Sequence, residues 1–143
     1  MNLNEMTGLQ FMQAHAQGLL PKPGMAITVP MEFELVEPNR VVFLVTANET
    51  HTNPVGGVHG GFAATVLDSV TACAISTTLA VGERCTTIEL NVKMCKAIPF
   101  NTQLRAEGTV INVTNRLAIA EGYIRDENGV LYAYGTSTCM MLR

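Results

Sequence analysis

One carboxylate stands inside a run of apolar residues, where a purely structural helix has no evident use for it. This residue, Asp68, belongs to the stretch NPVGGVHGGFAATVLDSV, residues 53–70. The same stretch also holds an amide, an imidazole and two adjacent glycines: Asn53, His59, Gly60 and Gly61. Carboxylates are almost never buried without a partner, so we expect Asp68 to face a cleft or an opposite charge. Poor solvation would make it a stronger base, suited to activate water or to attack a carbonyl carbon.

The glycines before the apolar run suit the start of a helix. A helix N-terminus offers free backbone N–H groups and the positive end of the helix dipole, and glycine lets a substrate approach that backbone closely. Such donors stabilise the oxyanion that forms when a carbonyl carbon is attacked. The loop does not fit a P-loop, because no Gly-Lys-Ser or Gly-Lys-Thr sequence follows it.

Each of these residues also has a structural interpretation. Asn53 precedes a proline and is a good turn initiator. His59 could serve only to satisfy backbone groups of a turn, and the glycines could simply form a tight loop. Asp68 could pair with a buried arginine or cap a neighbouring element. The residue types alone leave both interpretations open.

The elements that must position these residues follow from the hydrophobic pattern. Residues 4–19 predict a short amphipathic helix closed by Gly18, and residues 19–30, with three prolines, predict an irregular connector. Residues 32–48 predict two strands with a turn at Pro38-Asn39. The segment from about Gly61 to Leu79 is apolar nearly all the way round, which is typical of a buried helix. Its polar exceptions fall on one stripe that could line a cleft or a subunit contact: Thr65, Asp68, Ser69 and Ser76.

After this helix the pattern changes to a period of two. Four strands are expected, joined as an antiparallel meander, over residues 87–94, 102–113, 116–125 and 130–142. Thr114-Asn115 and residues 126–129 suit the hairpin turns between the last three. Glycines inside these strands, Gly108, Gly122 and Gly135, predict bulges or bends that let the sheet curve. We therefore expect one α+β domain over residues 1–143, a curved antiparallel sheet wrapped around a long helix.

The composition excludes several classes of protein. Of the 143 residues 48% are hydrophobic and only 15% are charged, so we expect part of the surface to be buried in an oligomer. A net charge of -3 argues against nucleic acid as a partner. The four cysteines form no CxxC pair and the three histidines do not cluster with them, which argues against a zinc site. The N-terminus lacks the features of a signal peptide, and no run approaches a membrane span, so a cytoplasmic protein is expected.

Together, Asn53, the His59-Gly60-Gly61 sequence and the acid eight positions after Gly60 resemble the hotdog-fold thioesterases, and most of all the phenylacetate-degradation (PaaI-like) type. The resemblance covers about residues 30–142, all but the N-terminal helix and connector (residues 1–29). It implies the hotdog fold and hydrolysis of an acyl-CoA thioester to a carboxylic acid and free coenzyme A. It also implies that no metal and no organic cofactor take part.

The family pattern further implies roles for individual residues. Gly60 would donate its N–H to the thioester carbonyl oxygen, and Asp68 would act as nucleophile or general base. Asn53 would position the water or the thioester, His59 would orient the loop, and the hydroxyl of Thr87 would assist. We expect substrate contacts from a second group, whose basic members suit the phosphates of coenzyme A: Gly61, Thr86, Asn91, Lys93 and Arg116.

Helix geometry limits what one chain can do. Eight residues separate Gly60 from Asp68, or roughly 12 Å along a helix, whereas both groups should lie about 3 Å from reacting atoms. The simplest solution pairs Gly60 of one subunit with Asp68 of another, and the resemblance likewise implies a dimer or a dimer of dimers. Two rivals remain: an acyl-thioester hydratase or dehydratase, against which the absence of any His after Asp68 counts, and a non-catalytic acyl-thioester binding module.

Overall fold

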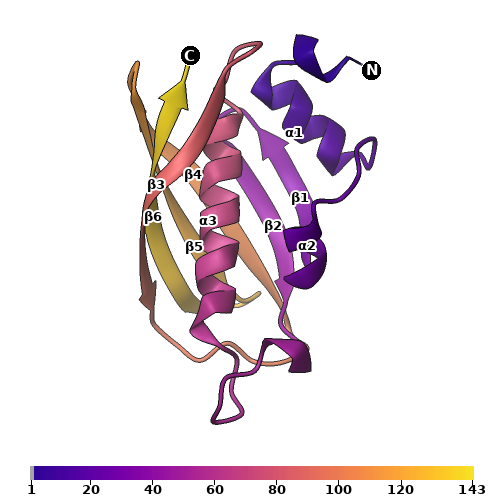
Figure 1. The fold of residues 1–143 in the computed structure, drawn as a ribbon. Coiled ribbons are helices and arrows are strands. Elements are labelled where there is room, and N and C mark those ends of the chain that lie inside the picture. Colours follow the sequence, from indigo (N-terminus) through magenta and orange to yellow (C-terminus); the bar gives the residue numbers. More distant parts are fainter. Residues whose placement is uncertain (1) are drawn as a thin grey trace.

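A six-stranded antiparallel sheet curves around one long helix, α3 (Gly60–Ser76), in the computed structural model, which describes residues 2–143. Figure 1 shows α3 lying against the concave side of the sheet, with the strands behind and beside it. The strands are β1 (Met31–Glu37), β2 (Arg40–Thr46), β3 (Arg84–Met94), β4 (Gln103–Val113), β5 (Leu117–Arg125) and β6 (Leu131–Leu142). The expected fold, a curved antiparallel sheet around a central helix, is confirmed.

The N-terminal segment is more divided than its pattern suggests. A single turn of 3-10 helix, Leu3–Glu5, precedes α1 (Gly8–Ala16), because Thr7 caps α1 in a reciprocal capping box with Gln10. The prediction that residues 19–30 are irregular is wrong in part, since α2 (Gly24–Thr28) forms there after Pro23. A proline restricts the residues before it more than those after it, so a short helix can follow one.

The order of strands in the sheet is β1-β2-β4-β5-β6-β3. The predicted meander is therefore right for β4, β5 and β6 but wrong for β3, which lies at the sheet edge beside β6 (Figure 1). A tight hairpin needs a loop of two to five residues, and the segment between β3 and β4, residues 95–102, is longer. The chain instead passes beneath α3 to the other half of the sheet, leaving one side of β3 unpaired within the described chain.

A β-bulge at Ile88 decides which residues of β3 face α3. Thr87 pairs with Cys139 and Glu89 with Thr138, so Ile88 is one residue too many for the ladder. Before the bulge Thr87 points toward α3. After the bulge Leu90 and Val92, which pair with the buried Ser137 and Gly135, point toward α3 instead.

Three glycines form a row across the inner face of the sheet. Gly108 pairs with Gly122, and Gly122 pairs with Gly135. A Cβ at Gly108 would lie 2.4 Å from the carbonyl oxygen of Val70, and a Cβ at Gly122 would lie 3.0 Å from Cγ2 of Thr71. Of the two predicted roles for these glycines, bulges or bends, the bulges are wrong, because the register shifts lie elsewhere, at residues 33–35, 87–89, 110–112 and 124–125. The glycines instead allow α3 to lie directly on the strands.

The main core lies between α3 and strands β1, β2, β4, β5 and β6, and it includes Leu67, Val70, Leu104 and Ile124. Helix α1 packs against β1 and the C-terminal half of α3, where the N–H of Gly8 donates to the carbonyl of Leu79. Within residues 2–143, no helix has both the length and the apolar character needed to cross a membrane.

Candidate active site

His59 caps the N-terminus of α3 and determines which backbone donor stays free. The N–H of Gly61 donates to Nδ1 of His59 over 2.8 Å, and the N–H of Phe62 donates to the His59 carbonyl. Because Nδ1 accepts this bond, the ring proton sits on Nε2. Among residues 2–143, the N–H of Gly60 has no hydrogen-bond partner. Gly60, rather than Gly61, therefore presents the open donor at the positive end of the helix.

Asn53 organises the loop that leads into α3. Its Oδ1 accepts hydrogen bonds from the N–H groups of Val55 (3.1 Å) and Gly57 (3.0 Å), and its own N–H donates to the Gly57 carbonyl. Asn53 therefore forms the turn that its position before a proline predicts. The side-chain NH2 group has no partner in the described chain, so the residue can form the turn and still offer donors to a ligand.

His51 is a structural residue that the sequence did not reveal. Its Nδ1 accepts from the N–H of Asn48, and its Nε2 bonds to the carbonyl of Thr28 over 2.7 Å. The N–H of His59 in turn donates to the carbonyl of His51. His51 thus fixes the loop before α3 to the end of α2. The residues it joins are far apart in the chain, and only the preceding Asn48 hinted at a capped turn.

The surroundings of the Asp68 carboxylate favour a catalytic role over a structural one. Its Oδ1 is fully buried and has no hydrogen-bond partner in residues 2–143, and none of the ion pairs there includes its carboxylate. The alternative of a buried Asp–Arg pair is therefore absent from the described chain. Only one other side-chain oxygen there is equally buried and unpaired, Oγ of Ser137 on the facing strand β6. An unpaired buried carboxylate oxygen is costly, and such a cost is typical of functional sites.

Asp68 and Thr87 both lie near Cys139. Oγ1 of Thr87 lies 3.7 Å from Sγ of Cys139. The pKa of Cys139 is raised by its hydrogen bond with Cys85, by burial and, less strongly, by the negative charge of Asp68. Burial likewise raises the pKa of Cys73 to about 12, with smaller contributions from Cys85 and Asp68. Cys73 is therefore a neutral thiol and no nucleophile, whereas Asp68, in the middle of α3, and Thr87, on β3, share Cys139 as a neighbour.

The expected substrate contacts on β3 lie on the outer face of the sheet, away from α3. Thr86, Asn91 and Lys93 pair with residues of β6 whose side chains point outward, so all three lie on the face opposite α3. Arg116 lies in the turn between β4 and β5, at the end of the sheet near the C-terminus of α3, where its carbonyl accepts from Met141. Lys96, a further basic residue that the sequence offers for the coenzyme A phosphates, lines the same hollow as Gly60.

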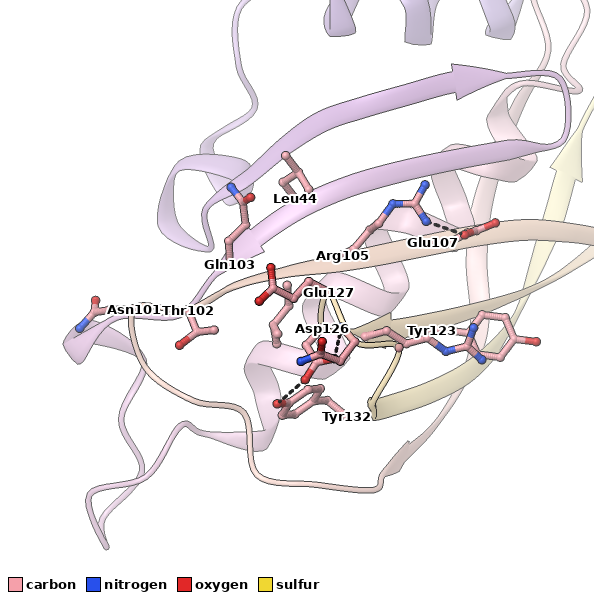
Figure 2. Close-up of a pocket in the computed structure, with 14 residues that line it drawn as sticks. Leu44, Asn101, Thr102, Gln103, Arg105, Glu107, Tyr123, Asp126, Glu127 and Tyr132 are labelled. Atoms are coloured by element: carbon pink, nitrogen blue, oxygen red, sulfur yellow. Dashed lines mark hydrogen bonds and ion pairs between the residues drawn. The ribbon is translucent and has the colours of Figure 1, made fainter.

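Two hollows differ in their chemistry. One, of about 320 Å³, lies at the N-terminus of α3 between His59, Gly60, Met94 and Lys96. The other, of about 770 Å³, lies on the outer face, and Figure 2 shows two of its carboxylates, Glu107 and Asp126, engaged and a third, Glu127, without an interaction among the residues drawn. There Glu107 is paired with Arg40 and Arg105, and Asp126 accepts from Tyr132 and from two backbone N–H groups. The smaller hollow is the one that contains the open N–H of Gly60. No group of three or more His, Cys, Asp or Glu side chains within residues 2–143 is arranged to hold a metal ion.

The structure thus divides the predicted catalytic residues into two groups on one chain. Asn53, His59 and Gly60 gather at the N-terminus of α3, whereas Asp68 and Thr87 lie about two turns further along. The two groups lie at different levels of β3. Gly60 is beside Met94, since a Cβ on Gly60 would lie 2.7 Å from Sδ of that residue, whereas Asp68 is near Thr87.

The comparisons with known proteins agree on one family. The family model described as the thioesterase superfamily matches residues 55–133. A phenylacetic acid degradation-related protein from Ralstonia eutropha is 27% identical with a TM-score of 0.82, over 91% of this chain and 98% of that one. Zebrafish thioesterase superfamily member 2 is 25% identical with a TM-score of 0.77, over 94% and 98% of the two chains. No curated protein sequence matches the chain significantly.

A thioesterase from Haemophilus influenzae extends the likeness of fold at lower identity. It is 16% identical, with a TM-score of 0.80 over 92% of this chain and 90% of that one. At this identity the likeness concerns the fold alone, and it confirms that the hotdog architecture is shared.

Proposed function

The chain belongs to the thioesterase superfamily, and from this premise we propose that it hydrolyses an acyl-CoA thioester to a carboxylic acid and free coenzyme A. The single observation that carries the proposal is the carboxylate of Asp68, whose Oδ1 is buried without a partner in the described chain. A binding module would gain nothing from such a costly group. A hydrolase needs a base or a nucleophile of this kind.

In the proposed reaction, the N–H of Gly60 donates to the thioester carbonyl oxygen and stabilises the oxyanion as it forms. The carboxylate of Asp68 either takes a proton from a water whose oxygen bonds to the carbonyl carbon, or bonds to that carbon itself before water releases the acid. In the first route the carbon–sulfur bond then breaks and the coenzyme A sulfur receives that proton. In the second route the carbon–sulfur bond breaks first, which leaves an anhydride between the acyl group and Asp68 and a coenzyme A thiolate; water then hydrolyses the anhydride, and a proton of this water goes to the thiolate. The NH2 group of Asn53 and the hydroxyl of Thr87 are donors available to hold the water or the carbonyl.

A second copy of the chain resolves the separation of about 12 Å between Gly60 and Asp68. Gly60 lies level with Met94 of β3, whereas Asp68 and Thr87 both lie near Cys139, and we take Asp68 to lie near the level of Thr87. A two-fold axis crossing β3 midway, near Leu90 and Asn91, would exchange these two levels. Gly60 of one protomer would then lie level with Asp68 of its partner.

The edge of the sheet supports this arrangement. Within the described chain β3 is eleven residues long and pairs only with β6, so one row of its backbone N–H and C=O groups is open. Long open edges normally find a partner. Antiparallel pairing of two β3 strands would join the two sheets and align the two helices, and a dimer of dimers would build on the same unit. We propose this shared site as the functional form.

Substitution of Asp68 tests the proposed chemistry. Asp68→Ala and Asp68→Asn should each lower kcat for a generic acyl-CoA by about 10²–10⁴-fold, as measured by thiol release. Both variants should keep the wild-type elution volume and circular dichroism, because the carboxylate makes no hydrogen bond or ion pair within residues 2–143 that folding would lose. Undiminished turnover in either pure variant would refute the assignment of Asp68.

Subunit mixing tests the shared site separately. Asp68→Ala and Gly60→Leu homo-oligomers should both be inactive, but a mixed dimer contains one site with an intact Gly60 and an intact Asp68. Exchange followed by assay should therefore recover up to about a quarter of wild-type activity per total protomer. No recovery after exchange verified by mass spectrometry would contradict the shared site.

A further inference from the structure

A third cavity, on the other side of α3 from β3, has no role in the proposed reaction. It measures about 490 Å³ and lies between α1, the connector with α2, the start of β1 and the middle of α3. Phe11 and Met12 line it from α1, Met25 from α2, Phe33 from β1 and Ser69 from α3. In Figure 1 these elements enclose the upper right flank of the central helix.

The wall of this cavity is apolar and carries no net charge inside. Phe33 and Phe43 pack with ring centroids 4.7 Å apart, and Phe11 meets the His15 ring edge-on at 4.8 Å. Burial lowers the pKa of His15, so its imidazole is neutral at neutral pH. The charged residues at the cavity, Lys22 and Glu32, form an ion pair with largely exposed side chains, which identifies them as the rim.

The cavity begins next to the proposed reacting carboxylate. Ser69, which lines it, directly follows Asp68, and Cys73 lines it one turn further along α3. The thiol of Cys73 stays protonated, because burial raises its pKa to about 12. The two α3 residues that line this space, Ser69 and Cys73, therefore offer no charge to a substrate that extends from Asp68 over the α3 surface.

We propose that this cavity binds the acyl group of the substrate, and that the group is an apolar chain of about eight to twelve carbons or an apolar ring system of similar volume. The inference rests on the proposed hydrolysis of an acyl-CoA. Ligand pockets typically measure about 300–1,000 Å³ with mainly apolar walls. If a methylene fills about the 30 Å³ of one liquid water, the cavity holds about twelve carbons at the density of a protein interior.

The test measures binding rather than turnover, so that it does not depend on the chemistry. S-alkyl-CoA thioethers with chains of two to sixteen carbons resist hydrolysis, and their Kd is measured by calorimetry. For the wild-type protein, the Kd should fall roughly fourfold per added methylene, until the chain reaches about ten carbons. Beyond that length the Kd should stay constant or rise.

Three variants locate the effect. Ala16→Phe adds a ring on the cavity wall and should end the fall in Kd three or four carbons earlier, weakening the decyl thioether at least tenfold while leaving the ethyl thioether unchanged. Gln17→Phe places the same ring on the neighbouring exposed residue, outside the cavity lining, and should match the wild type. Met25→Ala widens the cavity at α2 and should move the limit to longer chains.

The outcomes separate the two proposals. An Ala16→Phe protein with the chain-length profile of the wild type, or a wild-type Kd independent of chain length, overturns the assignment of the cavity even if acyl-CoA is hydrolysed. Conversely, chain-length-dependent binding that Ala16→Phe shortens supports the cavity. Such binding in a protein that hydrolyses no acyl-CoA would overturn the proposed hydrolysis alone.

Discussion

At the scale of residues, the candidate site is defined by polar groups that lack a partner within the described chain. Gly60 and Gly61 are neighbours of one type, yet the N–H of Gly61 is committed to His59 while that of Gly60 is open. Asp68 has a fully buried oxygen with no donor, which folding alone would not favour. The free N–H of Gly60 is available to donate to a substrate carbonyl, and the free oxygen of Asp68 is available to accept from a water.

The cysteines differ in pKa because their hydrogen bonds and burial differ. This difference predicts how the reactivity of Cys85 depends on pH. The hydrogen bond from Cys139 and the one with Ser76 lower the pKa of Cys85 to about 7, against the opposing effect of burial. Cys85 should therefore become a thiolate as pH rises through 7, while Cys73, with a pKa of about 12, stays protonated. In a Cys95→Ser background, which removes the exposed thiol, alkylation of Cys85 by iodoacetamide should reach half its maximal rate near pH 7. Peptide mass spectrometry measures it, and a midpoint at or above about 8.5, the value of an ordinary thiol, would contradict this pairing.

At the scale of elements, the central helix depends on the glycine row of the sheet. Gly108, Gly122 and Gly135 let α3 approach β4, β5 and β6 more closely than any side chain would allow. This close packing determines the distance between Asp68 and the strands below it. The position of the carboxylate relative to Thr87 is therefore a property of the helix–sheet contact, and not of either residue alone.

Substitution at the glycine row should push α3 away from the sheet and destabilise the protein. Gly108→Ala would bring a methyl group to 2.4 Å from the backbone oxygen of Val70, which cannot move without the helix. We expect a loss of about 3 kcal/mol in the free energy of unfolding and a Tm lower by roughly 10 °C. Gly24→Ala is the matched control, because a Cβ there meets nothing within 4 Å and the backbone is helical. Calorimetry measures both variants, and equal Tm values would argue against close packing of α3 on β4.

At the scale of the whole molecule, two surfaces remain open in a single chain. One is the unpaired edge of β3. The other is an apolar area on the outer face of the sheet, where the exposed Leu117 and Met140 pair across β5 and β6 next to Ile119. The low charged fraction of the chain had suggested that some apolar surface is covered in an oligomer. The edge suits the dimer that completes the site, and the outer face suits a further contact.

A charge on the β3 edge should separate the proposed dimer. Ile88, at the bulge, is 52% exposed. With the axis near Leu90 and Asn91, Ile88→Lys would set the new lysine opposite Lys93 of the partner subunit. Light scattering should record a species of lower mass than the wild-type oligomer. The kcat should fall as well, because dissociation separates Gly60 of one protomer from Asp68 of its partner. Val81→Lys alters an equally exposed residue, at 51%, in the loop before β3 and should change neither property. Full activity of a monomeric Ile88→Lys protein would contradict the shared site.

Much of this protein was predictable from local chemistry. The periodicity of two in the C-terminal half, the turn signals at Asn39 and at residues 126–129, and the apolar helix all depend on neighbours in the chain, so the strands and α3 were found with small errors at their ends. The motif of Asn53, His59, Gly60 and Asp68 likewise lies within sixteen residues. Its placement on α3 and the loop before that helix needed no tertiary information.

Other features depended on contacts between distant segments, which no local pattern records. The position of β3 beside β6 was decided by the long segment after β3 and by the room left beneath α3. The bulge at Ile88 turned Asn91 and Lys93 to the outer face, and a one-residue shift of this kind leaves the alternation in the sequence unchanged. The sequence by itself determined the elements and the reactive groups, because these follow from residue type and spacing. Only the tertiary structure decided that Gly61 is engaged, that Gly60 and the buried oxygen of Asp68 are left without partners in the described chain, and that a cavity opens beside Ser69, because hydrogen bonding and packing across the fold set each of these.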